Sequence, residues 1–366
     1  MNRALAAPVL LLLAGCAGLS TLPPPTQHCD VQGDLPALWQ CIGKPDPTPK
    51  ESGLTGTLRL ANGDLTRRLL LNQTPSLACN KKPWRGFEHK SLAAAGDAAP
   101  LEAFVHGGNA GAPVVLVIHG LYDSNSNRYI RYVASALADN GFGVVVPDMR
   151  WHGCLMSYLT TLGADESKDL LSWATAIRSG ALTPALGGRP IGLIGFSLGA
   201  FDVIDTISED HANVFDAGGI AVSPPARLDE VLTRLDRMRT PIGYYFRSTL
   251  RIRNRRLGIA FWAARPFRSY LEYFVEKKSL GNPDAFLQLI EPSKRLAAVQ
   301  RPLLILVARN DPVLGRVASD AIENATKPAN VHVIATNEGG HIGIIGRDSQ
   351  WFVNAMINFF ANRPQP

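Results

Sequence analysis

The fold is decided by residues 191–199, which read IGLIGFSLG. The first residues of this stretch are apolar or glycine, as in a strand buried on both faces of a parallel sheet, and a helical pattern begins at Leu198. Between them, Ser197 occupies a Gly-x-Ser-x-Gly motif. That motif is common by chance, but between a strand and a helix it predicts a nucleophile elbow, whose strained turn requires glycines. We therefore predict that Ser197 is a nucleophile at the carboxyl edge of the sheet.

A serine hydroxyl is a weak nucleophile and needs an adjacent base, which an acid must orient. His341 is the candidate base and Asp311 the candidate acid, because each follows a predicted strand. Glu338 is a rival acid, but it is too close to His341 in sequence to reach the imidazole ring comfortably. The order serine, aspartate, histidine is that of the α/β-hydrolases. We predict that Ser197, Asp311 and His341 form a catalytic triad.

The oxyanion of a tetrahedral intermediate needs hydrogen-bond donors. One expected donor is the backbone N–H of Leu198, directly after the nucleophile. The other is expected in residues 119–122, HGLY, which follow a buried strand; we assign it to Leu121, to within one residue. Gly120 permits a tight backbone at that point. His119 and His152 are expected to be structural residues.

Strands and helices alternate through most of the chain, which predicts a mostly parallel sheet covered on both faces. Residues 224–300 interrupt this alternation and predict a helical cap inserted between two core strands. The predicted fold class is therefore α/β, an α/β-hydrolase fold with a cap insertion, over residues 54–366. The expected strands are 54–60, 67–72, 101–106, 114–119, 144–147, 191–195, 220–222, 303–308 and 331–335, and the expected helices are 126–140, 165–179, one starting at 198, and 349–362.

Eight short motifs support this prediction: HGL (119–121), NRYIR (127–131), DMR (148–150), HG (152–153), GFSLG (195–199), SPP (223–225), NDP (310–312) and GGHIG (339–343). With them, the segment 113–360 resembles the YheT-like branch of the α/β-hydrolases. The resemblance places Ser197, Asp311 and His341 on the family's triad and implies a carboxylesterase or lipid hydrolase. Ala200 stands where a second glycine is usual, and Tyr122-Asp123 and the N-terminal extension also depart from the pattern, which leaves the substrate open.

These features predict a serine hydrolase that cleaves carboxylic esters, including lipid or acyl esters, through an acyl-enzyme. The acyl chain, the alcohol and the choice among ester, amide and thioester are left open. The alternative is a non-catalytic binding or scaffold lipoprotein on a hydrolase fold. We expect no cofactor, and without a CxxC pair we expect no metal site. The oligomeric state is undetermined.

The N-terminal residues have the pattern of an export signal. Arg3 precedes an apolar run at 4–13 that is too short to span a bilayer, and residues 13–16 read LAGC. This resembles a bacterial lipobox, which implies cleavage before Cys16 and lipidation of its thiol, with fatty-acyl groups such as palmitate. The alternative is an ordinary signal with a cysteine near its end. We expect a signal peptide at 1–15 and a Pro-rich tether at 16–53. Ala17, which is not aspartate, implies sorting to the outer rather than the inner membrane. The expected location is the cell envelope, on the periplasmic side, with the leaflet left open.

Four further cysteines fit an oxidising compartment. They are Cys29, Cys41, Cys79 and Cys154, and they allow three disulfide connectivities. We predict a Cys29–Cys41 disulfide that closes a short loop, with Cys79 and Cys154 either free or paired. The alternative is that all four are buried thiols.

The chain is basic, with a formal net charge of +6 and a pI near 9.1. A basic balance favours an anionic partner. Residues 227–268 contain eleven arginines and three acids. Arg251, Arg253, Arg255 and Arg256, beside the aromatic residues 244–246, form either a solvated helix face or a docking face for anionic headgroups. Nucleic acid is not an expected partner, because an exported chain meets little of it.

Overall fold

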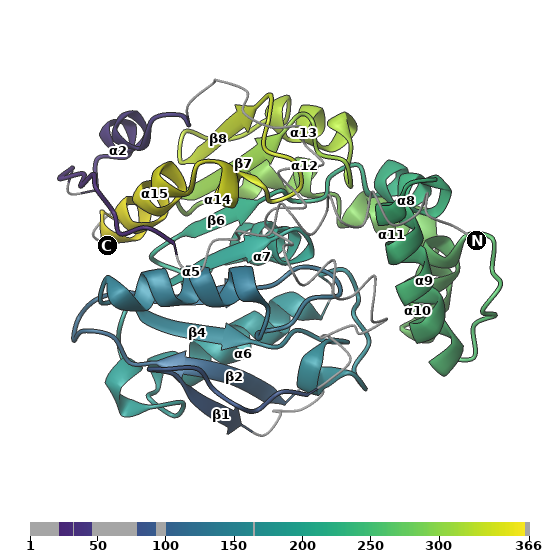
Figure 1. The fold of residues 1–366 in the computed structure, drawn as a ribbon, viewed down its shortest axis with the longest axis horizontal. Coiled ribbons are helices and arrows are strands. Elements are labelled where there is room, and N and C mark those ends of the chain that lie inside the picture. The colour runs from purple at the N-terminus through teal and green to yellow at the C-terminus, as the bar shows by residue number, and fades with distance from the viewer. Residues whose placement is uncertain (1–21, 32, 46–78, 93–99, 164, 363–366) are drawn as a thin grey trace, which may run out of the picture.

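The computed structural model describes residues 22–31, 33–45, 79–92, 100–163 and 165–362. In this part of the chain, eight strands form one sheet in the order β1-β2-β4-β3-β5-β6-β7-β8 (Figure 1). The pairs β1–β2 and β2–β4 are antiparallel, and every other neighbouring pair is parallel. The strands are β1 (Glu88–Leu92), β2 (Leu101–His106), β3 (Val114–Ile118), β4 (Gly143–Pro147), β5 (Ile191–Phe196), β6 (Gly219–Val222), β7 (Leu303–Ala308) and β8 (Val331–Thr336).

Helices cover both faces of the sheet. Successive residues of a strand point to opposite faces, and in β3 the side chains of Val114 and Leu116 join one apolar cluster while that of Val115 joins the other. The first cluster lies against α6 (Glu166–Arg178), α7 (Leu198–Ser208) and α13 (Arg316–Glu323), and the second lies against α5 (Arg128–Asp139) and α15 (Ser349–Ala361). The predicted α/β-hydrolase architecture is confirmed.

The insertion between β6 and β7 is helical and lies at one end of the sheet, on the right in Figure 1. Each of its helices after the first has proline at or next to its first residue, where the missing N–H costs no hydrogen bond. These are α8 (Leu228–Arg237), α9 (Pro241–Arg256), α10 (Pro266–Lys277), α11 (Pro283–Leu289) and α12 (Pro292–Arg295). The remaining short elements are η2 (Gly153–Leu155), η3 (Pro184–Leu186), η4 (Leu296–Ala298) and α14 (Ile344–Arg347).

Residues 22–31 and 33–45 pack more closely than the tether that their composition led us to expect. They form an extended segment and helix α2 (Leu35–Ile42), whose Leu38 is buried. Three asparagines spaced four residues apart, Asn354 and Asn358 in α15 and Asn362 at its C-cap, accept hydrogen bonds from the backbone of this segment. Because this polar row satisfies several backbone groups of the segment, a Pro-rich stretch can lie on a helix without joining a sheet.

Two disulfides are present. Cys29 is bonded to Cys41, the pair that we expected from sequence, and Cys79 is bonded to Cys154 in η2. The first closes the N-terminal segment around α2. The second fastens residue 79 beside the loop that follows β4.

Strand β1 was not predicted, because its residues EHKSL lack the apolar alternation of a half-buried strand and lie at the sheet edge. The expected strands at 54–60 and 67–72 lie outside the described residues. No helix in the described ranges is both long and apolar enough to cross a membrane.

Candidate active site

Ser197 lies in the sharp turn between β5 and α7, with backbone angles φ 55° and ψ −116°. A non-glycine residue rarely adopts this left-handed conformation, so the surrounding structure must enforce it. A Cβ atom at Gly195 would lie 2.1 Å from the carbonyl oxygen of Gly199, and one at Gly199 would lie 2.6 Å from the carbonyl oxygen of His119. Both glycines are therefore required for α7 to approach β5 and the neighbouring β3 loop closely.

The structure brings Ser197, Asp311 and His341 together at the carboxyl ends of β5, β7 and β8. His341 Nε2 lies 2.9 Å from Ser197 Oγ, and His341 Nδ1 lies 2.8 Å from Asp311 Oδ2. Asp311 is buried, and its other oxygen accepts the backbone N–H groups of Val313 and Leu314 at 2.8 and 2.9 Å. Because these bonds fix the carboxylate, it can hold the imidazole with Nδ1 protonated and Nε2 free to accept the serine proton.

The histidine loop is held by Asn310, a residue to which we had assigned no role. Its side-chain oxygen accepts the N–H of Gly340 at 2.9 Å, and its amide donates to Glu338 Oε2 at 2.6 Å. Asp311, and not the rival Glu338, is therefore the acid placed on Nδ1 of His341. Sequence gives little signal for Asn310 beyond its position next to Asp311.

The loop after β3 presents the backbone N–H of Leu121 as a candidate oxyanion donor. The N–H groups on either side are occupied, since Gly120 donates to Tyr129 Oη and Tyr122 donates to His152 Nε2 at 2.9 Å. Among the described residues, neither Leu121 nor Leu198 has a protein acceptor for its N–H. A Cβ at Gly120 would lie 3.1 Å from Ser197 Cβ, so this loop directly adjoins the nucleophile.

The two other histidines near the site support this loop. His119 Nε2 accepts the N–H of Met149 at 3.1 Å, and His152 Nδ1 lies 2.7 Å from the carbonyl oxygen of Arg150. Burial lowers the pKa of His152 well below its ordinary value, and Arg253 and His119 lower it further. A neutral His152 can donate from Nδ1 to Arg150 and accept from Tyr122 at Nε2, so its place in the structure is that of a support for residues 120–122.

Asp123 and Tyr129 also support the oxyanion loop, and sequence analysis missed them. Tyr129 Oη donates to Asp123 Oδ2 at 2.7 Å and accepts the N–H of Gly120 at 3.3 Å. Asn127 completes the group with a hydrogen bond to Asp123 Oδ1. Only the fold brings these groups to the start of α5, so no motif could have indicated the contact.

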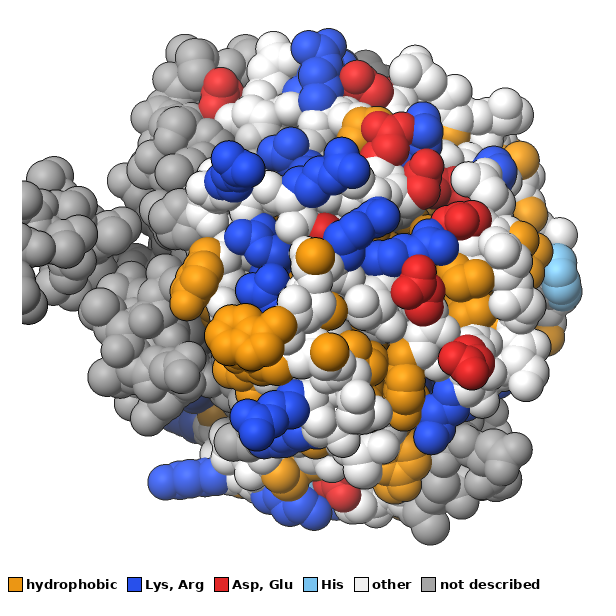
Figure 2. All heavy atoms as spheres, turned by 90° about the vertical axis from the view of Figure 1, so that its right-hand side faces the viewer, with side chains coloured by type: hydrophobic (Ala, Val, Ile, Leu, Met, Phe, Trp, Pro, Cys, Tyr) orange, Lys and Arg blue, Asp and Glu red, His pale blue; other side chains and the backbone are white. Residues whose placement is uncertain are grey.

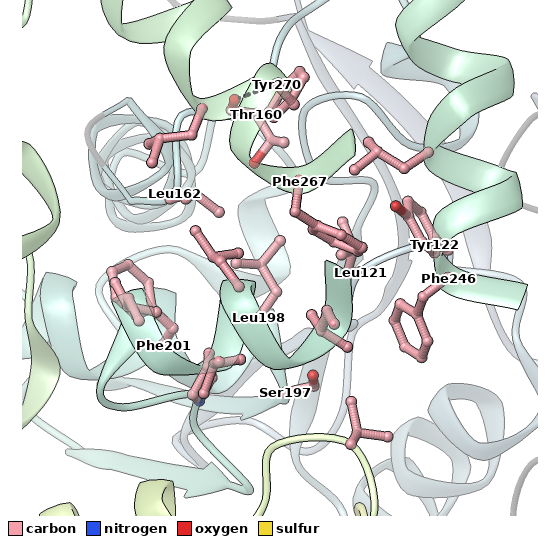
Figure 3. Close-up of a pocket in the computed structure, with 18 of the residues that line it drawn as sticks. Leu121, Tyr122, Thr160, Leu162, Ser197, Leu198, Phe201, Phe246, Phe267 and Tyr270 are labelled. Atoms are coloured by element: carbon pink, nitrogen blue, oxygen red, sulfur yellow. Dashed lines mark hydrogen bonds between the residues drawn. The ribbon is translucent and has the colours of Figure 1, made fainter. Parts of the chain in front are cut away.

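An almost wholly apolar pocket opens beside Ser197 (Figure 3). Figure 3 shows Leu121, Leu198 and Phe246 near the serine, with Thr160 and Tyr270 on the far side of the pocket. Its volume is about 70 Å³. The sheet domain and cap helices α8, α9 and α10 both contribute to its lining, which comprises Leu121, Tyr122, Trp151, Thr160, Leu162, Ser197, Leu198, Phe201, Pro225, Leu228, Val231, Leu232, Leu235, Phe246, Leu250, Phe267, Tyr270, Leu271, Val313 and Leu314.

Arg253 corrects our expectation of one exposed arginine cluster on the cap. Its side chain is buried, with the guanidinium 4.8 Å from the Tyr122 ring centroid and 4.9 Å from that of Trp151, and it donates to the Trp151 carbonyl at 2.7 Å. Burial lowers its pKa to about 10. Arg253 therefore ties α9 to the pocket wall and is not available to headgroups. Of the aromatic neighbours, Tyr245 is buried and Phe246 faces the pocket.

In the part of the chain that the structure describes, no cluster of histidine, cysteine, aspartate and glutamate is arranged to hold a metal ion. The polar side chains at the site are those of an acid, a base and a nucleophile. The arrangement can activate a hydroxyl and stabilise a negative oxygen with the protein's own groups.

Several solved structures share this fold at low sequence identity, which establishes the fold and no more. An esterase of Pyrococcus furiosus aligns with a TM-score of 0.54 at 20% identity, over 78% of this chain and 98% of that one. An acylaminoacyl peptidase of Pyrococcus horikoshii gives 0.52 at 16%, over 81% of this chain and 43% of that one. A puromycin-hydrolyzing peptidase of Mycobacterium tuberculosis gives 0.53 at 15%, over 77% and 41%.

No curated protein matches the chain. The model of the alpha/beta hydrolase family does match, over residues 114–355. That range contains Ser197, Asp311 and His341 and includes the whole cap. The chain therefore belongs to the alpha/beta hydrolase family.

Proposed function

We propose that this chain is a serine hydrolase that cleaves carboxylic esters with an apolar acyl group, through an acyl-enzyme on Ser197. The observation that carries the proposal is the pair of short contacts from His341, 2.9 Å to Ser197 Oγ and 2.8 Å to Asp311 Oδ2, beside an apolar pocket. A scaffold without activity would have no need for this connected set of groups.

The proposed reaction has two halves. His341 Nε2 takes the proton of Ser197 as Oγ attacks the ester carbonyl, and the imidazolium then gives that proton to the departing alcohol. The N–H groups of Leu121 and Leu198 stabilise the negative oxygen of each tetrahedral intermediate. In the second half His341 removes a proton from water, the water oxygen attacks the acyl carbon, and the carboxylic acid leaves as Ser197 Oγ regains its proton.

The pocket supports an apolar acyl group as the recognised part of the substrate. Its lining is hydrophobic apart from the Ser197 hydroxyl, the Trp151 indole N–H and the polar groups of Thr160, Tyr122 and Tyr270. Tyr270 already donates to the Thr160 carbonyl at 2.6 Å, so it is not free to select a polar substrate. The resemblance to the YheT-like branch points the same way, toward carboxylesters and lipids.

We also propose that the chain is a lipoprotein anchored through Cys16 to the periplasmic side of the outer membrane. This rests on the LAGC stretch and on Ala17, which lie outside the described residues. Two or more acyl chains hold a protein stably on a bilayer. The variant Cys16→Ser should lose the lipid, and it should then either leave the membrane fraction or remain unprocessed with residues 1–15 attached. If the variant sediments with membranes after its signal has been removed, as the native chain does, this anchor is wrong.

A series of p-nitrophenyl esters with acyl chains from acetate to palmitate tests the ester assignment. We expect kcat/KM to rise as the acyl chain fills the pocket and to fall once it exceeds the pocket length. Amides with matched acyl groups serve as the comparison. Turnover of amides above that of esters, or no turnover of any ester, would contradict the proposal.

A further inference from the structure

The tip of the cap is the stretch 255–265, which joins the end of α9 to the start of α10. Its sequence, RRLGIAFWAAR, contains three arginines and no acidic residue. The lack of acids extends well beyond the tip, since residues 237–271 contain nine arginines and neither aspartate nor glutamate. The cap therefore concentrates positive charge in one continuous part of the chain.

The three tip arginines are exposed. Arg255, Arg256 and Arg265 form no ion pair with any residue that the structure describes. By contrast, Arg227, near the first helix of the cap, pairs with Glu230, and Arg268 in α10 pairs with Asp284. Arg265 lies within electrostatic range of Asp236 and Asp284 but is not ion-paired with either. The tip thus presents three exposed cations without an ion pair among the described residues.

The tip also carries an exposed indole. Trp262 is 83% exposed, and its ring lies nearly perpendicular to that of Phe261, with ring centroids 4.7 Å apart. Figure 2 shows this side of the molecule, where hydrophobic side chains emerge among lysines and arginines. An indole left in water contributes nothing to the core, and tryptophan is enriched where a membrane meets water, because its ring is apolar and its N–H is polar.

We propose that the tip of the cap binds the surface of an anionic phospholipid membrane, with Trp262 entering the headgroup region and Arg255, Arg256 and Arg265 contacting lipid phosphates. Arginine forks onto a phosphate with two parallel hydrogen bonds, and several such cations in the same short stretch as one exposed indole match a charged surface with an apolar interior. Membrane docking therefore accounts for the charge and for the tryptophan together.

Helix α9 connects this surface to the pocket. Phe246 and Leu250 line the pocket, Arg253 fastens the helix to Trp151, and the next turn ends in the tip. A tip seated on lipid would hold the cap wall of the pocket close to the source of acyl chains. This last consequence rests on the proposed function, whereas the membrane binding itself does not.

The experiment measures vesicle binding by the full chain with Cys16→Ser, which removes the lipid anchor from every sample. Vesicles of phosphatidylglycerol are compared with vesicles of phosphatidylcholine. The triple variant Arg255→Gln, Arg256→Gln, Arg265→Gln should bind phosphatidylglycerol at least about tenfold more weakly, and Trp262→Ala should weaken binding further when combined with it. The preference for phosphatidylglycerol should fade as salt screens the charges.

A matched triple variant, Arg85→Gln, Arg128→Gln, Arg316→Gln, changes the net charge equally at exposed arginines outside the cap. It should keep most of the affinity for phosphatidylglycerol. Thermal melting of each variant confirms that it is folded. Because the experiment measures vesicle binding, its result does not depend on hydrolase activity. Equal losses in the two triple variants would show an effect of net charge alone and overturn the proposal, as would native affinity in the tip variant.

Discussion

The carboxyl edge of the sheet and the cap position their functional residues by different means. At the sheet edge, strand ends place Ser197, Asp311 and His341, and backbone N–H groups fix the acid. In the cap, side-chain packing positions the residues: the Arg253 guanidinium packs over the rings of Tyr122 and Trp151. The backbone positions at strand ends change little when individual side chains are substituted, whereas the packing of side chains changes with each substitution. The comparison implies that the edge determines the reaction and the cap determines the substrate.

The largest effect should come from Ser197→Ala, which removes the nucleophile from the sheet edge. We expect kcat for p-nitrophenyl esters to fall by about 10⁴-fold or more while the melting temperature stays close to that of the native chain. Ser279→Ala, at an exposed serine of the cap, is the matched control and should leave kcat unchanged. Substantial turnover by Ser197→Ala would show that Ser197 at the sheet edge is not the nucleophile.

Asp311→Asn should have the next largest effect, because the amide cannot hold His341 with Nδ1 protonated in the same way. We expect a loss in kcat of about 10²–10⁴-fold, measured at saturating ester. Glu338→Gln is the control, since Glu338 is the other acid near His341 and accepts a hydrogen bond from Asn310, the neighbour of Asp311. If Glu338→Gln were the more damaging variant, the roles of the two acids would have to be exchanged.

A change in the cap should alter selectivity rather than chemistry. Leu232 is half-buried in α8 and lines the pocket, so Leu232→Phe should reduce the space for an acyl chain. We expect kcat/KM for a long-chain ester to fall about 10–100-fold relative to acetate. Leu289→Phe, at a leucine of α11 that is 71% exposed, should leave this ratio unchanged. A uniform loss for all chain lengths would mean that the cap contributes to the reaction itself.

The smallest effect concerns stability, in the core helix that follows the nucleophile. Asp202 is buried in α7, and its Oδ1 has no hydrogen-bond partner among the described residues. Burial raises its pKa well above the ordinary value, and the charges of Glu166, Asp205 and Asp169 raise it further. The folded chain therefore keeps a proton that the unfolded chain releases, so stability is lost as pH rises above about 4 and through the raised pKa.

Asp202→Asn should remove this loss, because the amide stays neutral at every pH. We expect the melting temperature to rise by about 2–4 °C at pH 8 and to change little at pH 4. Calorimetry at both pH values makes the comparison. A gain of the same size at pH 4 would show that the ionisation of Asp202 is not the cause.

Much of the sheet and its edge could be predicted from sequence, because these features are local. The buried strands are continuous apolar runs, and the placement of Ser197, Asp311 and His341 follows from the strand that each residue succeeds. The Leu121 and Leu198 N–H groups were likewise indicated by their positions after a strand and after the nucleophile.

Side-chain contacts between distant segments could not be predicted. Arg253 reads as one of four neighbouring cations, and only the packing of α9 against Trp151 shows that it is buried. The N-terminal segment reads as a tether, because the asparagines that accept its backbone N–H groups lie more than 300 residues later on α15. Composition describes such a segment alone, whereas its structure depends on what it packs against.

The central claim is that Ser197 is a nucleophile activated by His341. The most direct measurement is covalent labelling with an alkyl fluorophosphonate, with the site of phosphonylation mapped by mass spectrometry. We predict one adduct, on the peptide that contains Ser197, and its loss in both Ser197→Ala and His341→Ala, because the alanine chain lacks the base. No adduct on the folded native chain, or an adduct on another serine that persists in Ser197→Ala, would contradict the account.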